Sequence, residues 1–299
     1  MALVVLGSLC AVAAAQGVVV QDFSFQIKDV KPGGRFTVVF NSHSYDTSGG
    51  IPAPLTSNYI RIPKGSTVPK AFKKPQYYCN AKKLVDMVRM DKGSGRFTPY
   101  MNKLLKGKPV PPKNAKSLIK TCRFARIGTG RVLVDARPYA ADPIPADLMM
   151  FWTKPDPGAA ATFSIVGIPD ERVPIVANNP TIRETTPVIN ASFFSDPTPD
   201  GLYDYKLVLP TGPINGIQIS VAEVHVTTTG LSLTRKKTTC LKHKGKRCVK
   251  KKVKKTNLFW FTQPQCPASG QLSFQAFYGY ASNPPETKTI TIPCPKFKR

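Results

Sequence analysis

Acidic residues and histidines are scarce in this 299-residue chain. It has 17 Asp and Glu residues against 43 Lys and Arg residues, and three histidines. No two cysteines are spaced as C-x-x-C, so the usual ligand pattern of a structural zinc site is missing. The G-x-S-x-G, H-E-x-x-H and P-loop motifs are missing as well, which removes sequence support for the enzymes that carry them. We therefore predict no metal, no cofactor and no catalytic residue.

An uncharged apolar stretch opens the sequence. Met1–Ala15 ends in three alanines before Gln16 and resembles the hydrophobic region and A-x-A cleavage site of a secretory leader, although no basic residue precedes it. A transmembrane anchor is the alternative, but the stretch is shorter than the roughly 20 residues that a span requires. We expect residues 1–15 to be removed. The remainder is then secreted or held at the cell envelope, with no transmembrane segment.

Six cysteines follow the expected leader. An even number of cysteines after a leader predicts disulfides formed in an oxidising compartment. Many pairings are possible, and we favour the pairing of neighbours in the sequence: Cys79–Cys122, Cys240–Cys248 and Cys266–Cys294. Metal ligation is the alternative, and the shortage of histidine disfavours it.

Composition and periodicity favour a β-rich globular fold. The 29 prolines and 21 glycines suit many short strands joined by turns, and a hydrophobic fraction of 41% excludes wholesale disorder. The strands that we predict are Phe36–Phe40, a short strand followed by a turn in Tyr59–Gly65, Arg131–Asp135, Leu148–Trp152, Thr162–Ile168, Tyr205–Leu209, Ile217–Val226, Leu258–Phe261, Leu272–Tyr278 and Thr287–Ile292. In Leu272–Tyr278 the apolar residues fall at period two, which indicates one buried face.

The apolar phase shifts by one residue inside Ile217–Val226. The alternating apolar residues occupy odd-numbered positions before Ala222 and even-numbered positions after it. This shift predicts a β-bulge near that residue. The bulge would turn Glu223 and His225 to the solvent face. The alternative is that the two side chains, which project from one face, supply two ligands or an acid–base pair.

The segment between Cys79 and Cys122 has a helical pattern. Three short apolar stripes, two of them preceded by Asn80 and Asn114 as caps, predict a three-helix insertion over about residues 80–122. The predicted fold is mainly β: an antiparallel β-sandwich with this insertion and a basic, disulfide-closed hairpin. We interpret residues 16–299 as a single domain. The alternative is a split near residue 210, with an immunoglobulin-like module at 213–295.

Four passages together resemble a loosely defined group of secreted β-rich proteins of high-GC Gram-positive bacteria. They are Ile60–Gly65, Cys122–Gly130, Cys266–Gly270 and Ile292–Pro295. In that group a cysteine and a glycine-containing turn lead into a long β region, and a late cysteine pair brackets a hairpin. The resemblance implies a secreted β-sandwich-like domain and supports the Cys266–Cys294 pairing. It implies no activity, and the lysine-rich segment from Cys240 to Cys248 departs from its pattern.

Two further patterns bear on enzymatic chemistry. Gly128-Thr129-Gly130 lacks the rest of a dinucleotide-binding fingerprint, so we interpret it as a turn. An acidic pair for glycoside hydrolysis would have to come from Asp135, Asp142, Asp147, Asp156, Asp170 and Glu171. Two of these precede proline, which is typical of residues that start turns. A hydrolase with an unidentified carboxylate pair stays an alternative, as does a carrier that holds an apolar ligand between sheets.

The strongest chemical signal is a run of positive charge. Twelve of the 21 residues from Arg235 to Lys255 are Lys or Arg, and none is acidic. The run would form a hairpin from strands Leu231–Thr239 and Val249–Thr256, closed by Cys240–Cys248. The predicted polyanion-binding residues are Lys242, Lys244, Lys246, Arg247, Lys250, Lys251, Lys252, Lys254 and Lys255.

These lysines favour a non-enzymatic protein that binds anionic surface polymers. Teichoic-type polymers, phospholipid headgroups, acidic polysaccharide and, without sequence preference, nucleic acid all offer the required charge. The aromatic residues that follow, Phe259-Trp260-Phe261, would interleave with that charge or point into the core. The alternative is that the lysines form a solvated edge that blocks strand-to-strand aggregation.

Overall fold

The computed structural model describes residues 19–31, 35–50, 52–67, 78–80, 122, 125–135, 143–169, 174, 178, 188–212, 220–228, 232–245, 247–259, 266–281 and 283–295. These residues form thirteen β-strands and include no helical element, so the predicted mainly β class is confirmed. The leader at 1–15 and nearly all of the three-helix insertion lie outside the described residues. No helix among the residues that are described is long and apolar enough to cross a membrane.

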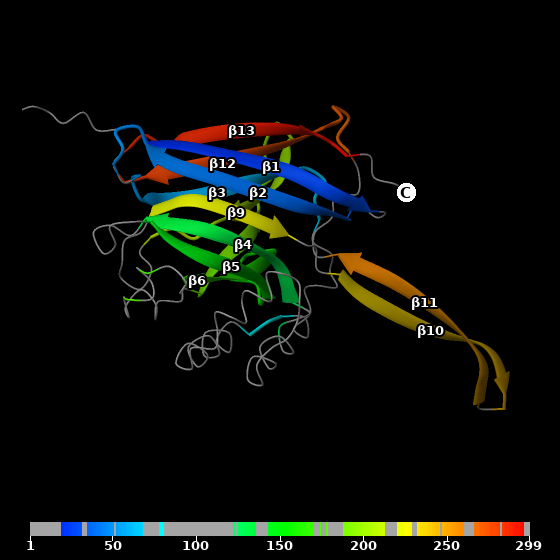
Figure 1. Cartoon of the computed structure of the whole chain (residues 1–299). Coiled ribbons are helices and arrows are strands. Elements are labelled where there is room, and N and C mark those ends of the chain that lie inside the picture. The colour runs from blue at the N-terminus through cyan, green and yellow to red at the C-terminus, as the bar shows by residue number, and fades with distance from the viewer. Residues whose placement is uncertain are drawn as a thin grey trace, which may run out of the picture.

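Eleven strands are hydrogen-bonded into one antiparallel sheet (Figure 1). Their order across the sheet is β1 (Val19–Lys31), β2 (Arg35–Asp46), β9 (Ser220–Thr228), β4 (Arg126–Asp135), β5 (Ile144–Thr153), β6 (Ala161–Pro169), β7 (Val188–Ser195), β8 (Tyr203–Val208), β3 (Leu55–Pro63), β12 (Gln271–Tyr280) and β13 (Glu286–Pro293). The other two strands, β10 (Ser232–Lys244) and β11 (Arg247–Phe259), form a separate two-stranded ribbon. The predicted sandwich is not confirmed, because the eleven strands belong to one continuous sheet.

Strands that are distant in the sequence lie side by side in this sheet. Strand β9 is paired with both β2 and β4, and β12 is paired with both β3 and β13. The described strands on the two sides of residue 210 therefore share one sheet. This arrangement matters for function because it brings the polar side chains of early and late strands onto one surface.

The two outer strands of the sheet approach each other, so the sheet is nearly closed. Lys288 on β13 contacts Asp22 on β1 over 3.2 Å and Glu286 over 3.1 Å. Burial lowers the pKa of Lys288, but the hydrogen bonds to Glu286 and Asp22 outweigh that effect and raise the pKa above its ordinary value. In the interior, Phe25 stacks on Phe274 with ring centroids 4.4 Å apart, which joins β1 to β12.

The core is centred on β5. Trp152, Met149, Ile127 and Val166 are almost completely buried, and β5 is buried on both of its faces over Leu148–Trp152. A strand covered on both sides requires a continuous apolar run, and Leu148–Trp152 is such a run. The alternation predicted for Leu272–Tyr278 is also confirmed, because all four apolar side chains on that face of β12 are buried.

All three predicted disulfides are present. Cys79–Cys122, Cys240–Cys248 and Cys266–Cys294 have Cα atoms 5.0, 5.9 and 5.8 Å apart. Cys79 and Cys122 are buried in the core, and the backbone N–H of Cys79 donates to the carbonyl of Trp152 over 2.7 Å. That disulfide therefore fixes both ends of the 79–122 segment against β5.

The bulge predicted near Ala222 is confirmed. On β4 the consecutive residues Leu133 and Val134 pair with Glu223 and Val221, so Ala222 is the extra residue. Beyond the bulge, Glu223 and His225 are exposed, while Val224 between them is partly buried. The solvent-facing interpretation of these two polar side chains is therefore correct.

The turn predicted at Gly128-Thr129-Gly130 is wrong, because these residues lie inside β4. A Cβ atom at Gly128 would lie 2.8 Å from the carbonyl oxygen of Thr227, and one at Gly130 would overlap the carbonyl oxygen of His225. Both glycines therefore allow close approach of β4 to β9 rather than a change of chain direction.

Gly130→Ala is expected to lower the free energy of unfolding by about 2 kcal/mol, because the added methyl group forces β4 away from β9. The measurement is equilibrium unfolding in guanidinium chloride. Thr129→Ala, at the residue between the two glycines, is the control and should cost less, because it adds no atoms. An equal loss in the two variants would contradict the close-approach argument.

Candidate functional site

The predicted polyanion-binding residues lie on the β10–β11 ribbon. Lys242 and Lys244 are on β10, Lys246 lies outside the described residues, and the other six residues are on β11. Figure 1 shows the ribbon projecting away from the eleven-stranded sheet. With 13 residues in each strand, it is about 44 Å long. The structure therefore gathers the eight described residues of this set on a single protruding element.

The register of the ribbon sets positive charge opposite positive charge. Lys242 pairs with Lys250, Lys244 with Arg247, Lys236 with Lys255, and Lys237 with Lys254. No residue from 232 to 259 is acidic. Like charges directly opposite each other on neighbouring strands destabilise the pairing. The ribbon thus keeps an unfavourable charge arrangement that an external anion would neutralise.

A covalent crosslink holds the charged strands together. An isolated two-stranded hairpin is marginally stable in water even without charge repulsion. The Cys240–Cys248 disulfide closes the distal part of the ribbon, around Gly245, which has a φ of 58° suited to the reversing turn. Lys242 and Arg247, on either side of this turn, are both exposed. The crosslink therefore maintains a charged, solvated tip.

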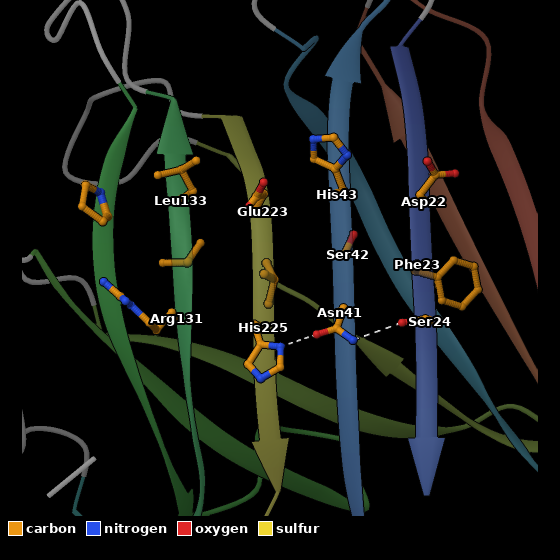
Figure 2. Close-up of a pocket in the computed structure, with 13 residues that line it drawn as sticks. Asp22, Phe23, Ser24, Asn41, Ser42, His43, Arg131, Leu133, Glu223 and His225 are labelled. Carbon is orange, nitrogen blue, oxygen red and sulfur yellow. Dashed lines mark hydrogen bonds between the residues drawn. The ribbon is translucent and has the colours of Figure 1, made fainter. Parts of the chain in front are cut away.

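A second candidate surface is a groove of about 610 Å³ on the outer face of β1, β2, β9, β4 and β5 (Figure 2). The strand register arranges its side chains in two rows across these strands. The first row is Asp22, His43, Glu223, Leu133 and Pro145, and the second is Ser24, Asn41, His225 and Arg131. Rows formed by alternate residues of a strand lie about 7 Å apart.

One hydrogen-bonded chain links three of the four residues in the second row. Asn41 Nδ2 donates to Ser24 Oγ over 3.1 Å, and Asn41 Oδ1 is hydrogen-bonded to His225 Nδ1. Because the amide oxygen can only accept, His225 Nδ1 carries the proton. A neutral His225 then presents Nε2 as a hydrogen-bond acceptor. Figure 2 shows this chain running from β9 across β2 to β1.

His43 occupies the centre of the first row. The register places it between Asp22 on β1 and Glu223 on β9, and its ring stacks on Tyr45 with centroids 5.1 Å apart. Asp22 is already ion-paired with Lys288. The groove therefore offers hydrogen-bond donors and acceptors and contains both acidic and basic side chains. This combination suits a small polar ligand. No cluster of three metal-ligating side chains occurs among the described residues.

Sequence reasoning identified Glu223 and His225 but missed the rest of the groove. Their exposure followed from the bulge, whereas His43 and Asp22 come from strands nearly 200 residues earlier in the chain. The polar residues around His43, Asn41-Ser42-His43-Ser44, are typical of a turn and predict a hydrogen-bonding loop residue, but the structure places His43 within β2 instead. Pairing between distant strands is what brings the two histidines onto one surface.

Three of the carboxylates considered for hydrolysis lie among the described residues, and each of them is buried or hydrogen-bonded. Asp147 is buried and ion-paired with Arg131 over 3.6 Å, and Asp135 is also buried. Asp156 accepts hydrogen bonds from Ser192 and Asn190, and it starts a turn, as predicted. Asp142, Asp170 and Glu171 lie outside the described residues.

Comparison with known proteins found no matching family model, no significantly similar curated protein and no significantly similar solved structure. The two surfaces differ in the charge that they carry. The groove is small and electrically mixed, whereas the ribbon carries charge of one sign on an element that makes its main contacts with itself.

Proposed function

We propose that this protein binds polyanions through the β10–β11 ribbon and acts without catalysis, as a secreted or envelope-associated binding protein. The observation that carries the proposal is the cation-opposite-cation register of a ribbon that has no acidic residue. Positive charges on adjacent strands repel each other and destabilise the pairing of the strands when the ribbon is alone. The same charges become favourable when an anionic surface lies beside them.

The form of the ribbon suits a long, repetitive ligand. Its length of about 44 Å spans several phosphate or sulfate groups of an extended polymer. Lysine provides a point charge without a fixed bidentate geometry, so such contacts give affinity rather than sequence readout. The class of ligand supported is an anionic polymer or surface: acidic polysaccharide, teichoic-type polymer, phospholipid headgroups or, non-specifically, nucleic acid.

Wild-type protein is expected to stay on heparin resin above physiological salt and to bind soluble heparin with a steep salt dependence. Each cation that displaces a counterion contributes to the slope of log affinity against log salt concentration. The measurement is a salt titration by calorimetry or fluorescence anisotropy. Elution below physiological salt would contradict the proposal. It would favour the alternative that the lysines only prevent edge-to-edge aggregation.

Two other functions have less support. A carrier for an apolar ligand needs interior volume, and the stacked rings of Phe25 and Phe274 and the buried Trp152 fill part of the interior. A hydrolase needs two carboxylates across a cleft, and the outer groove has Asp22 and Glu223 on either side of His43. The ion pair from Asp22 to Lys288 gives that aspartate a structural role instead.

A further inference from the structure

Exposed aliphatic side chains accompany the charge on the ribbon. Among the described residues, six large apolar side chains are exposed, and three of these are on the ribbon: Leu241 at 54%, Val249 at 50% and Val253 at 51%. A soluble polyanion offers no apolar phase for such groups. Their presence within a cationic run therefore indicates a partner that is both anionic and apolar.

Two of these residues are the extra residues of β-bulges. On β10, Leu241 is skipped between the pairs Cys240–Lys251 and Lys242–Lys250. On β11, Val249 is skipped between the pairs Lys242–Lys250 and His243–Cys248. A bulge redirects a side chain and increases the local twist of the strand. Both strands thus deviate from regular pairing at an aliphatic residue.

The disulfide fixes both bulges. Leu241 directly follows Cys240, and Val249 directly follows Cys248, and these two cysteines are bonded to each other with Cα atoms 5.9 Å apart. The crosslink therefore holds the two aliphatic residues near each other at the distal part of the ribbon. Lys242 and Arg247 are exposed beside them. The result is a compact tip with apolar groups surrounded by cations.

We infer that this tip docks on an anionic lipid bilayer. Leu241 and Val249 enter the boundary between headgroups and acyl chains, and the neighbouring cations contact headgroup phosphates. An anionic bilayer supplies both environments, because basic residues gain from the surface potential while aliphatic groups gain from the apolar layer. The inference names one partner for the proposed polyanion-binding ribbon and depends on that function.

The test compares two double variants in co-sedimentation with sucrose-loaded vesicles of mixed phosphatidylglycerol and phosphatidylcholine. Leu241→Ser with Val249→Ser is expected to weaken vesicle binding roughly thirtyfold, because two aliphatic side chains no longer enter the apolar layer. Its retention on heparin should not change. The control is Leu202→Ser with Val221→Ser, which removes two exposed aliphatic side chains outside the ribbon and should leave vesicle binding unchanged.

The outcomes separate the inference from the proposed function. Wild-type protein that is retained on heparin but does not sediment with the vesicles overturns the lipid inference alone. Equal vesicle affinity in the Leu241/Val249 variant and the wild type also overturns it. Wild-type protein that binds neither heparin nor the vesicles contradicts the proposed function as well. Normal heparin retention by the Leu241/Val249 variant confirms that its charged ribbon is intact.

Discussion

Replacing Lys242, Arg247 and Lys250 with glutamine is expected to weaken heparin binding about a hundredfold at low salt. Each cation close to an anionic surface contributes about 1 kcal/mol, so three contribute roughly a factor of 10² in affinity. Counterion release adds a second signature, because the salt slope should become shallower by about 0.7 to 0.9 for each lost contact. Both quantities come from one series of binding isotherms at increasing salt.

The matched control for this variant removes the same charge from another part of the molecule. Lys28, Lys64 and Lys154 are exposed and lie outside the ribbon, so replacing them with glutamine lowers the net charge equally. This control variant should keep nearly all of its affinity and its salt slope. If both triple variants lose affinity to the same extent, the protein attracts polyanions by its overall charge, and the ribbon has no special role.

Removing the buried disulfide with Cys79→Ala and Cys122→Ala is expected to lower the free energy of unfolding by about 4 kcal/mol. The two cysteines are 43 residues apart, and opening a loop of that length increases the entropy of the unfolded chain by roughly this amount. Both sulfur atoms also leave the core beside β5, which adds to the loss. Guanidinium chloride unfolding, followed by far-ultraviolet circular dichroism, measures the change.

The second disulfide gives the comparison. Cys240→Ala with Cys248→Ala should leave the unfolding of the eleven-stranded sheet almost unchanged, because the ribbon makes its main contacts within itself. The same variant should weaken vesicle binding, since the two bulged aliphatic residues are no longer held together. A loss of sheet stability comparable to that of the Cys79/Cys122 variant would show that the ribbon folds as part of the core.

Some features of the fold could be predicted because they depend only on the residues of one short segment. The run Leu148–Trp152 predicted a strand, and the one-residue phase shift predicted the bulge at Ala222. Strands β1 and β7 were missed. Buried Ser192 and Gln21 place polar residues in the interiors of these strands, where their hydrogen bonds involve Asp156 and Ser44. Such partners cannot be inferred from the segment alone.

In the candidate sites too, some residues could be recognised from the sequence and others could not. The cations of the ribbon were evident from composition, because charge requires no knowledge of the neighbouring strand. The exposed Leu241 and Val249 were not recognised, since only the pairing register reveals which residue of a strand is unpaired. Gly128 and Gly130 were misinterpreted as a turn for a related reason, because glycine also serves where two strands approach closely.

The sequence by itself determined the β class and the concentration of positive charge, because alternation and composition are local properties. The order of the cysteines only favoured the three disulfide pairs, which the structure then established. Only the tertiary structure decided that eleven strands join in one nearly closed sheet, that His43 and His225 share a groove, and that the ribbon projects from the sheet. The physical reason is that strand pairing depends on hydrogen bonds between segments far apart in the chain. A period of two specifies which face of a strand is buried, but it does not specify the neighbouring strand.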